Sequence, residues 1–600
     1  MESSTVKVKR RFASVVDLAV RAWQTFRRFP FVILSAIGAA VLLHHLAGIE
    51  FDPARGADTF YPALMACILG IPLFIAIELL AESRGWSGTA RLEAALVGLA
   101  LLVAYYAVLP YPITGAEVAR CLLLIAGLHL LISFVPFGLR SGTENGLWQY
   151  NKVLLLRFIL AALYTLVLYV GLSLALLACD TLLEIDVEPW NYVQLWYWAA
   201  FVYATWFFLA GIPENVRSLE RVRDYPVGLR VFTQYVLIPL VVIYLIILYA
   251  YTAKIIIQWS LPQGWVGYPV IGVSVTGMLA LLLVHPIRER AESAWIASYA
   301  KYFYWTLYPL IALLAIAIAT RIADYGVTER RYLVVVAGAW LLGVALYFSF
   351  GRRKGIRVIP ISLCIVTFLT TFGPWSATSV SRRSQLGRLR DILIREEVMI
   401  DGRLDSTPKR IDFERESEIS DIVRYLHDMH GIARIRDWYA RPERLPDEAT
   451  PQLALQEMGL LYRRRWEERD EFAIRPREPN PLALEGFHYL YRITASAQND
   501  TLELRARLDS ATELYLHGTR LLLGPPDDPS ERLLLELAPT ILDLRERERR
   551  DEPYGPEAST LDVENARYRL VLHLAEADGY VIADSVRLSR ISATALITRK

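Results

Sequence analysis

The residue types best suited to bind a ligand gather in one short loop between two apolar segments, RIADYGVTERRY at positions 321–332. Arginine binds phosphate and carboxylate groups through paired hydrogen bonds, so the loop predicts an anion or headgroup site. The predicted ligand residues here are Arg321, Asp324, Tyr325, Arg330 and Arg331. A second interpretation stays open, in which the loop only anchors the chain at a membrane surface and Asp324 and Glu329 pair with the arginines. Gly326 predicts a tight turn between the two segments.

A second group of polar residues lies inside the apolar segments themselves. Ionisable side chains within a membrane span are costly and are therefore functional candidates by default. They are His44, His45, Glu78 and His129. A proton relay and hydrogen-bonded packing both explain the histidines, and we favour packing. Glu78 lies near the end of its segment, where its side chain can reach the membrane surface.

Two tyrosines complete the set of predicted ligand residues. Tyr244 and Tyr251 are seven residues apart in the segment QYVLIPLVVIYLIILYAYTAK and share one helical face. Pro239 predicts a kink in the same helix. This face could line a substrate groove, although an interfacial aromatic belt explains the tyrosines equally well.

No motif predicts a catalytic centre. A phosphate-binding P-loop, a nucleophile elbow, a zinc-protease helix and a dinucleotide fingerprint are all missing from the sequence. His427 and His430 could share a helical face, but a metal site needs a third ligand that the sequence does not identify. We therefore predict no metal and no cofactor. The formal net charge of +2 also argues against a nucleic-acid partner.

The elements that must position these residues are apolar runs of membrane-spanning length. Hydrophobic residues make up 54% of the 600 residues, and most charged residues follow Gly373. Eleven runs approach the roughly 20 residues that cross a bilayer. They are Phe31–Gly48, Tyr61–Leu80, Leu92–Leu109, Val118–Leu139, Phe158–Cys179, Val193–Ile212, Val231–Thr252, Tyr268–His285, Phe303–Thr320, Tyr332–Phe350 and Val358–Gly373. The predicted fold is an all-α polytopic membrane bundle of about 11 transmembrane helices, followed by a soluble α+β domain that ends in antiparallel strands.

The distribution of Lys and Arg predicts the orientation of this bundle. Basic residues concentrate in the loops that share a side with the N-terminus, which places that side in the cytoplasm. Residues 1–30 form a basic, amphipathic cytoplasmic segment, and residues 31–373 form the transmembrane domain. An odd number of spans then places residues 374–600 outside. We expect a multi-pass protein of a bacterial inner membrane.

The tail after Gly373 divides into two predicted parts. Residues 374–480 form a helical part with helices over Ser379–Ile400 and Ser417–His430, the first of them capped by Ser379 or Ser381. Residues 481–600 form a β-rich part. Its strands include Thr501–Leu508 and Tyr568–Leu574, where apolar and polar residues alternate, and Arg545–Arg550 forms a solvated helix face.

Three stretches resemble a bacterial membrane family catalogued as domain of unknown function 4153. The most specific is GPWSATSVSRRSQLGRLR at Gly373–Arg390; the others are Tyr325–Tyr332 and Tyr235–Tyr251. The resemblance implies a polytopic inner-membrane protein with a soluble C-terminal part. It implies no activity, substrate or cofactor, so it assigns no residue a role.

These observations lead to one expected function and two alternatives. We expect a non-enzymatic role in the cell envelope, moving or sensing a lipid-linked or amphiphilic molecule, with the lipid bilayer as the main partner. The first alternative is an integral-membrane transferase that uses an acidic base from the loop holding Glu50, Asp52 and Asp58. The second is a membrane-anchored sensor or scaffold whose soluble tail binds a protein partner. The oligomeric state stays open.

Overall fold

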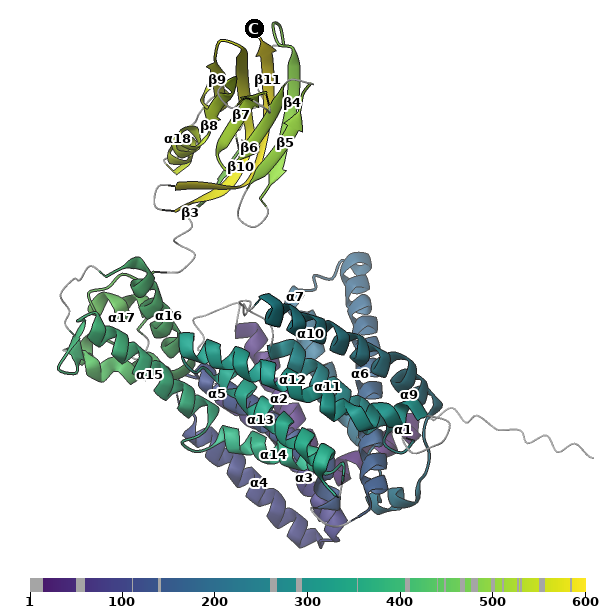
Figure 1. Cartoon of the computed structure of the whole chain (residues 1–600). Helices are drawn as coiled ribbons and strands as arrows, with labels where there is room; N and C mark the ends of the chain where they lie inside the picture. Colours follow the sequence, from purple (N-terminus) through teal and green to yellow (C-terminus); the bar gives the residue numbers. More distant parts are fainter. Residues whose placement is uncertain are drawn as a thin grey trace, which may run out of the picture. The chain divides into compact units, whose positions relative to one another are not determined.

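The computed structural model divides the chain into two compact units, one of residues 1–405 and 422–450 and the other of residues 406–421 and 451–600. The residues it describes are 15–49, 60–110, 112–138, 142–258, 267–287, 294–352, 354–404, 411–439, 441–446, 449–463, 470–475, 484–497, 502–509, 512–525, 528, 531–549, 556–582 and 585–600. We call the unit of residues 1–405 and 422–450 the helical unit and the unit of residues 406–421 and 451–600 the β unit. Figure 1 labels helices and strands of both units.

The helical unit is a bundle of mostly apolar helices. They are α1 (Val15–Arg28), α2 (Pro30–Ile49), α3 (Tyr61–Arg84), α4 (Gly88–Val108), α5 (Gly115–Phe134), α6 (Glu144–Leu183), α7 (Pro189–Tyr197), α8 (Ala204–Leu209), α9 (Val227–Phe232), α10 (Ile238–Gln258), α11 (Gly267–Val284), α12 (Ala294–Tyr325), α13 (Glu329–Phe350), α14 (Val358–Thr371) and α15 (Ala377–Arg395). Among them, α1 and α15 carry many charged residues. A short hairpin of β1 (Met399–Ile400) and β2 (Arg403–Leu404) follows, and α16 (Phe413–His430) crosses the division between the units.

Nine helices in the described part of the chain are long and apolar enough to cross a membrane, and Val358–Thr371 is a shorter apolar helix. Each of the eleven predicted spans falls on helical structure, which confirms the predicted class of fold. The segment predicted as Val193–Ile212 is not one regular helix, because a π-helical segment (η4, Trp198–Tyr203) separates α7 from α8. The apolar helices indicate a multi-pass membrane protein.

Pro239 lies beside a second π-helical segment, η6 (Thr233–Leu237), which precedes α10. A proline inside a helix removes one hydrogen bond and crowds the carbonyl four residues earlier, here that of Tyr235. A wider π turn makes room at this point. The irregularity that the sequence predicts at Pro239 is therefore present and takes the form of a π turn.

Large apolar side chains cover the outside of the bundle. Most of the apolar part of α6 is not buried inside the bundle, and Phe158, Leu166 and Val167 are each more than half exposed. Inside the bundle, small residues allow close contact between helices. A Cβ atom on Gly277 of α11 would lie 2.1 Å from the ring of Phe303 in α12. The bundle thus exposes apolar side chains on its outer surface and is closely packed inside.

Polar contacts join the helices at both ends of the bundle. Polar side chains are less costly there than in the apolar middle of the bundle. At one end Arg28 binds Glu82 of α3 with N–O distances of 2.7 and 2.8 Å, and Trp148 of α6 donates to the carbonyl of Leu282 of α11 at 2.7 Å. At the other end, the Nε of Arg120 in α5 lies 3.1 Å from the hydroxyl of Thr378 in α15.

The helices predicted after Gly373 are present with shifted ends. Ser376, rather than Ser379 or Ser381, caps α15 by accepting a hydrogen bond from the Ser379 N–H at 3.3 Å. The predicted caps are wrong because the helix already begins at Ala377, which places Ser379 and Ser381 inside it. The second helix begins at Phe413, four residues before the predicted start.

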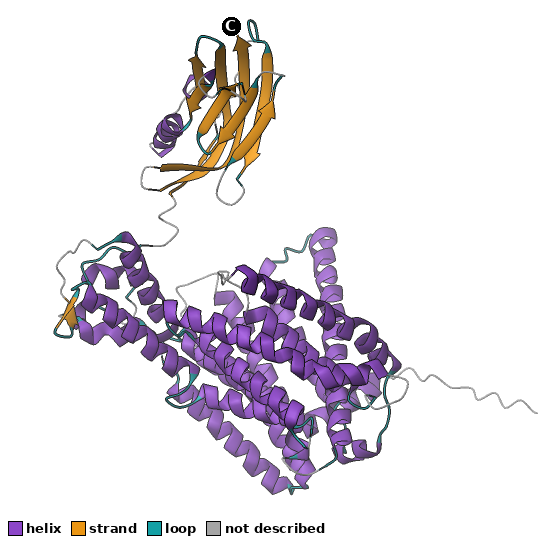
Figure 2. Ribbon diagram, viewed as in Figure 1, coloured by secondary structure: helices purple, strands orange, loops and turns teal. Residues whose placement is uncertain are grey.

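In its described residues, the β unit holds two antiparallel sheets, the first part of α16, and the helices α17 (Pro451–Glu457) and α18 (Ala538–Arg549). Figure 2 shows the strands of the sheets in orange. One sheet has the order β3-β10-β11-β4, with β9 also paired to β10, and the other has the order β5-β6-β7-β8. The strands are β3 (Asp470–Ile474), β4 (Tyr489–Ser496), β5 (Glu503–Arg507), β6 (Glu513–His517), β7 (Arg520–Gly524), β8 (Leu533–Glu536), β9 (Thr560–Glu564), β10 (Tyr568–Ile582) and β11 (Ser585–Arg599).

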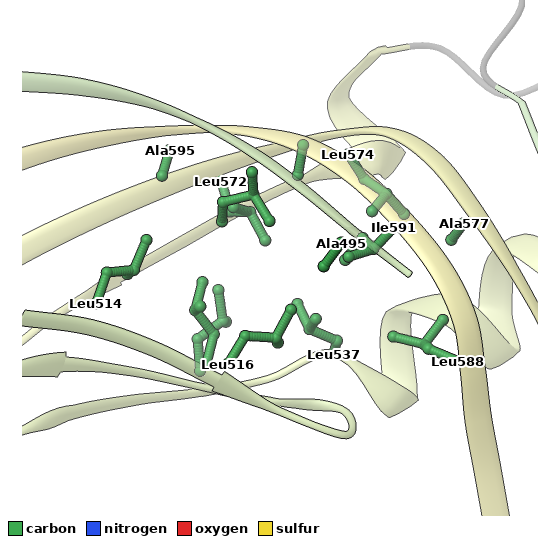
Figure 3. Close-up of a cluster of buried hydrophobic side chains, with 14 of the residues drawn as sticks. Ala495, Leu514, Leu516, Leu537, Leu572, Leu574, Ala577, Leu588, Ile591 and Ala595 are labelled. Carbon is green, nitrogen blue, oxygen red and sulfur yellow. The ribbon is translucent and has the colours of Figure 1, made fainter. Parts of the chain in front are cut away.

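Leucine, isoleucine and alanine side chains from both sheets form the core of the β unit. Figure 3 shows Leu514 and Leu516 of β6 on one side of this core and Leu572 and Leu574 of β10 on the other. These residues occupy alternate positions because successive side chains of a strand point to opposite faces. The antiparallel strands predicted at the end of the chain are confirmed.

A candidate anion site at the turn between α12 and α13

The predicted arginine loop is a short turn between two long helices. Helix α12 ends at Tyr325, and the N–H of Gly326 donates to the carbonyl of Ile322 at 2.9 Å. Gly326 has a φ of +68°, a left-handed conformation that favours glycine. Helix α13 then begins at Glu329, with Thr328 before it. Two arginines, Arg330 and Arg331, therefore lie in the first turn of α13, and Arg321 lies four residues before the end of α12.

Side chains of α15 hold this turn in place. The amide nitrogen of Gln385 donates to the carbonyls of Tyr325 and Val327, both at 3.0 Å. The hydroxyl of Ser384 accepts a hydrogen bond from the N–H of Val327 at 2.9 Å. A Cβ atom on Gly326 would lie only 2.8 Å from the Gln385 nitrogen, so this approach also requires glycine. The turn is thus fixed by a helix that lies more than fifty residues further along the chain.

This contact joins two of the three stretches on which the family resemblance rests. Residues 325–332 form the turn, and the string 373–390 supplies the helix that binds it. A further hydrogen bond runs from the hydroxyl of Tyr332 to the carbonyl of Trp375 at 2.5 Å. The two strings therefore form one structural feature.

Glu329 lies at the centre of a buried polar cluster on the same end of the bundle. Its carboxylate accepts hydrogen bonds from the hydroxyls of Ser381 in α15, at 2.5 Å, and of Tyr425 in α16. The Nε2 atom of His430 lies 3.2 Å from the same carboxylate. The side chains of Glu329 and His430 are only 7% and 4% exposed. This cluster joins α13, α15 and the last part of α16, and all of its members belong to the helical unit.

The hydroxyl of Tyr425 remains a hydrogen-bond donor at neutral pH. Burial raises the pKa of Tyr425, and its hydrogen bond to Glu329 raises the pKa further. A protonated phenol can satisfy a buried carboxylate that would otherwise be very costly. The cluster is therefore structural: Glu329 is occupied by its own partners and does not neutralise the nearby arginines.

Three arginines surround the ring of Tyr325. The guanidinium carbons of Arg321, Arg331 and Arg388 lie 5.8, 5.3 and 5.9 Å from its centre. Arg331 also donates to the carbonyls of Tyr325 and Gly326 at 3.0 and 2.8 Å, which satisfies the end of α12. Cation–π contact offsets part of the repulsion between the like charges. A bound anion would offset the remainder.

A pocket of about 340 Å³ opens beside these arginines. Arg321, Arg330 and Arg331 form its basic part. Apolar or aromatic side chains of three helices form the rest, and they are Tyr268, Leu314, Ala317, Ile318 and Val334. Within the residues that the structure describes, no ion pair joins Asp324 or Glu329 to these three arginines. The arrangement can hold a phosphate or carboxylate headgroup against guanidinium groups while an attached chain lies on the apolar wall.

The other residues of the predicted site do not join this pocket. Asp324 is exposed, and neither Asp324 nor Tyr325 lines the pocket. Tyr244 and Tyr251 belong to α10: Tyr244 is 49% exposed, and Tyr251 packs against the core of α10 to α13. The structure thus brings together three of the predicted arginines and places the two tyrosines elsewhere.

The polar residues predicted within the spans make mostly local contacts. Glu78 forms an ion pair with Arg91 at 2.9 Å, and the Nδ1 atom of His129 lies 2.8 Å from the carbonyl of Ile125, one helical turn earlier. His44 lies edge-on to Trp198, and His45 lies edge-on to Phe60. These contacts are of the packing kind, which is the interpretation that we favour, and a proton relay through these residues stays the alternative.

The remaining candidates lie apart. His427 contacts Asp428 at 2.8 Å, whereas His430 points to Glu329. Among the described residues, no three His, Cys, Asp or Glu side chains converge as a metal site would require. Glu50, Asp52 and Asp58, the acidic residues of the transferase alternative, lie outside the described residues.

Sequence reasoning missed the partners that α15 and α16 bring to the turn. These are Ser381, Ser384, Gln385, Arg388 and Tyr425. The usable signal in the sequence is the string at Gly373–Arg390, for which the sequence predicts only a helix cap and a family resemblance. In the membrane-anchoring interpretation of the loop Glu329 pairs with the arginines, whereas the structure shows that it binds hydroxyl groups and His430.

Comparison with known proteins agrees with this architecture. The family model described as Domain of unknown function (DUF4153) matches residues 21–396. An uncharacterized protein of Pasteurella multocida (strain Pm70) is 28% identical over 335 residues, which cover 55% of this chain and 54% of the relative. The match thus spans about half the length of that relative. No solved structure matches the chain. Because the family model covers well over half of the 600 residues, the chain belongs to the family described as domain of unknown function 4153.

Proposed function

We propose that the protein binds an anionic lipid-linked or amphiphilic molecule at the arginine pocket, in order to move or sense it in the bacterial cell envelope. The observation that carries this proposal is the composition of the pocket, where three guanidinium groups adjoin an apolar wall from α11, α12 and α13. A headgroup phosphate would lie at Arg321, Arg330 and Arg331, and the attached chain would lie along Leu314 and Val334.

The location of the turn supports an envelope role. It lies at the end of α12 and the start of α13, where a bilayer presents its headgroups. In the proposed orientation this end faces away from the cytoplasm, because the basic loops before Gly373 gather at the opposite end. The proposed membrane is the bacterial inner membrane.

The first test is the amount of anionic lipid that stays bound to the purified protein. The variant R321Q/R330Q/R331Q should retain about tenfold to a hundredfold less anionic lipid at this site, since charge-assisted hydrogen bonds contribute about 1.5–3 kcal/mol each. Native mass spectrometry from mixed neutral and anionic nanodiscs measures the bound lipid.

The matched control is R352Q/K354Q, which removes two exposed charges just beyond the opposite end of α13. This control should retain anionic lipid as the unmodified chain does. Equal retention by R321Q/R330Q/R331Q and the control would contradict the proposed site.

A further inference from the structure

A larger groove lies between α1, α6 and the broken helix α7–η4–α8. Its volume is about 890 Å³, and it shares no lining residue with the arginine pocket. Size alone places it in the range of about 300–1,000 Å³ that is usual for ligand sites. All of its lining residues belong to the helical unit.

One end of the groove is charged. Arg28, Arg157 and Glu214 line it there, close to residues 211–213, and Arg21 lines the groove from α1. Arg28 forms an ion pair with Glu82 near the C-terminal end of α3. It also donates to the carbonyls of Ile212 and Pro213, just after α8, at 2.7 and 2.9 Å. Arg28 therefore joins α1 to the ends of α3 and α8.

Two of these arginines are free to bind a ligand. Arg157 lies against Gly211: a Cβ atom on Gly211 would be 2.4 Å from the Nε atom of Arg157. Arg21 and Arg157 are exposed, and neither forms an ion pair within the described part of the chain.

The rest of the groove is apolar and follows the helices toward the middle of the bundle. Leu168 and Leu172 of α6 and Leu195 of α7 line this part. Arg157 and Leu172 are 15 residues apart in one helix, or about 22 Å at 1.5 Å per residue. One leaflet of a bilayer contributes about 15 Å of hydrocarbon, so the groove matches one leaflet with its headgroup layer.

An irregular helical segment forms part of the wall of the groove. Four lining residues come from the π-helical segment, namely Trp198, Ala199, Val202 and Tyr203. π-helical turns occur often at functional sites because they displace side chains from the regular helical path. The Nε1 atom of Trp206 donates to the carbonyl of Ala22 at 3.2 Å, which fastens α8 to α1. In α1, Leu18 and Trp23 are about 60% exposed, as in helices that lie at a membrane interface.

We propose that this groove holds one anionic phospholipid of the surrounding bilayer, with its phosphate at Arg21 and Arg157 and one acyl chain along the apolar wall. The charged end supplies the selectivity for an anionic headgroup, and the length of the apolar wall fits an acyl chain in one leaflet. The site is independent of the proposed function at the arginine pocket and lies at the opposite end of the bundle.

The test uses the full chain in nanodiscs of phosphatidylcholine and phosphatidylglycerol. The variant R21Q/R157Q should lower retained phosphatidylglycerol at this site about tenfold, and the variant V202W should lower it by filling the apolar wall with all charges kept. The control R84Q/R223Q removes two exposed arginines near the same end of the bundle and should retain the lipid. Unchanged retention in both R21Q/R157Q and V202W would overturn the proposal.

Two further measurements distinguish this groove from the arginine pocket and from a site for free phosphate compounds. A phosphatidylglycerol analogue with a photoreactive acyl chain should label peptides of α6 or η4. The variant R321Q/R330Q/R331Q should be labelled at the same peptides as the unmodified chain. Loss of binding at the arginine pocket would therefore leave the groove testable. Glycerol phosphate without acyl chains should not displace the lipid. Displacement by glycerol phosphate, or equal retention of phosphatidylcholine, would contradict an anionic phospholipid site.

Discussion

Replacing Glu329 by alanine should lower the free energy of unfolding of the helical unit by about 2–5 kcal/mol. The substitution leaves the buried hydroxyl of Ser381 and the part-buried hydroxyl of Tyr425 without their acceptor, and it removes the partner of His430. A buried donor that loses its partner costs about 1–3 kcal/mol. Thermal unfolding of the purified protein in detergent measures the loss, and limited proteolysis between α15 and α16 should become faster.

Two variants make this prediction specific. Glu329→Gln keeps one carbonyl acceptor and the side-chain volume, so its loss of stability should be smaller than that of Glu329→Ala. Glu443→Ala removes an exposed carboxylate from the same unit and should change stability by less than about 0.5 kcal/mol. If Glu329→Ala unfolds at the same temperature as Glu443→Ala, the polar cluster does not hold α15 and α16 to the bundle.

Replacing Leu516 by alanine should destabilise the β unit by about 2–5 kcal/mol, because Leu516 is fully buried between the two sheets. The lost side chain leaves a cavity that close-packed neighbours refill only in part. The loss should appear as earlier unfolding of the strands, followed by hydrogen exchange of β6 and β10 in the full chain.

The matched control is Leu534→Ala on β8. Leu534 carries the same side chain but is 52% exposed, because it points to the other face of its sheet. Its substitution should change hydrogen exchange little. Equal effects of the two substitutions would show that the sheets do not pack through the face that contains Leu516.

The sequence predicts the helices and strands well because the physics that forms them is local. A bilayer demands about 20 consecutive apolar residues, and each such run stands out whatever its neighbours are. The alternation at Tyr568–Leu574 likewise shows one buried face of β10. The π turn at Trp198–Tyr203 leaves no such signal, because residues of the same types also form regular helix.

The site could be predicted only in part, for a geometric reason. Arg321, Arg330 and Arg331 are noticeable as charges between apolar runs. Glu329 is close to Arg330 and Arg331 in the chain, but each residue of a helix points about 100° away from the one before it. Over two residues the difference is about 200°, so Glu329 and Arg331 face nearly opposite directions. The contribution of Arg388 depends on the docking of α15, which involves contacts between residues far apart in the chain.

The most direct test of the arginine pocket is photo-cross-linking with an anionic phospholipid analogue whose reactive group lies on the acyl chain near the headgroup, followed by mapping of the labelled peptides. We predict that label concentrates on peptides holding Leu314–Ile318 and Val334, and that R321Q/R330Q/R331Q loses it while R352Q/K354Q keeps it. Label spread evenly over the exposed helices, unchanged by the three arginine substitutions, would contradict the account.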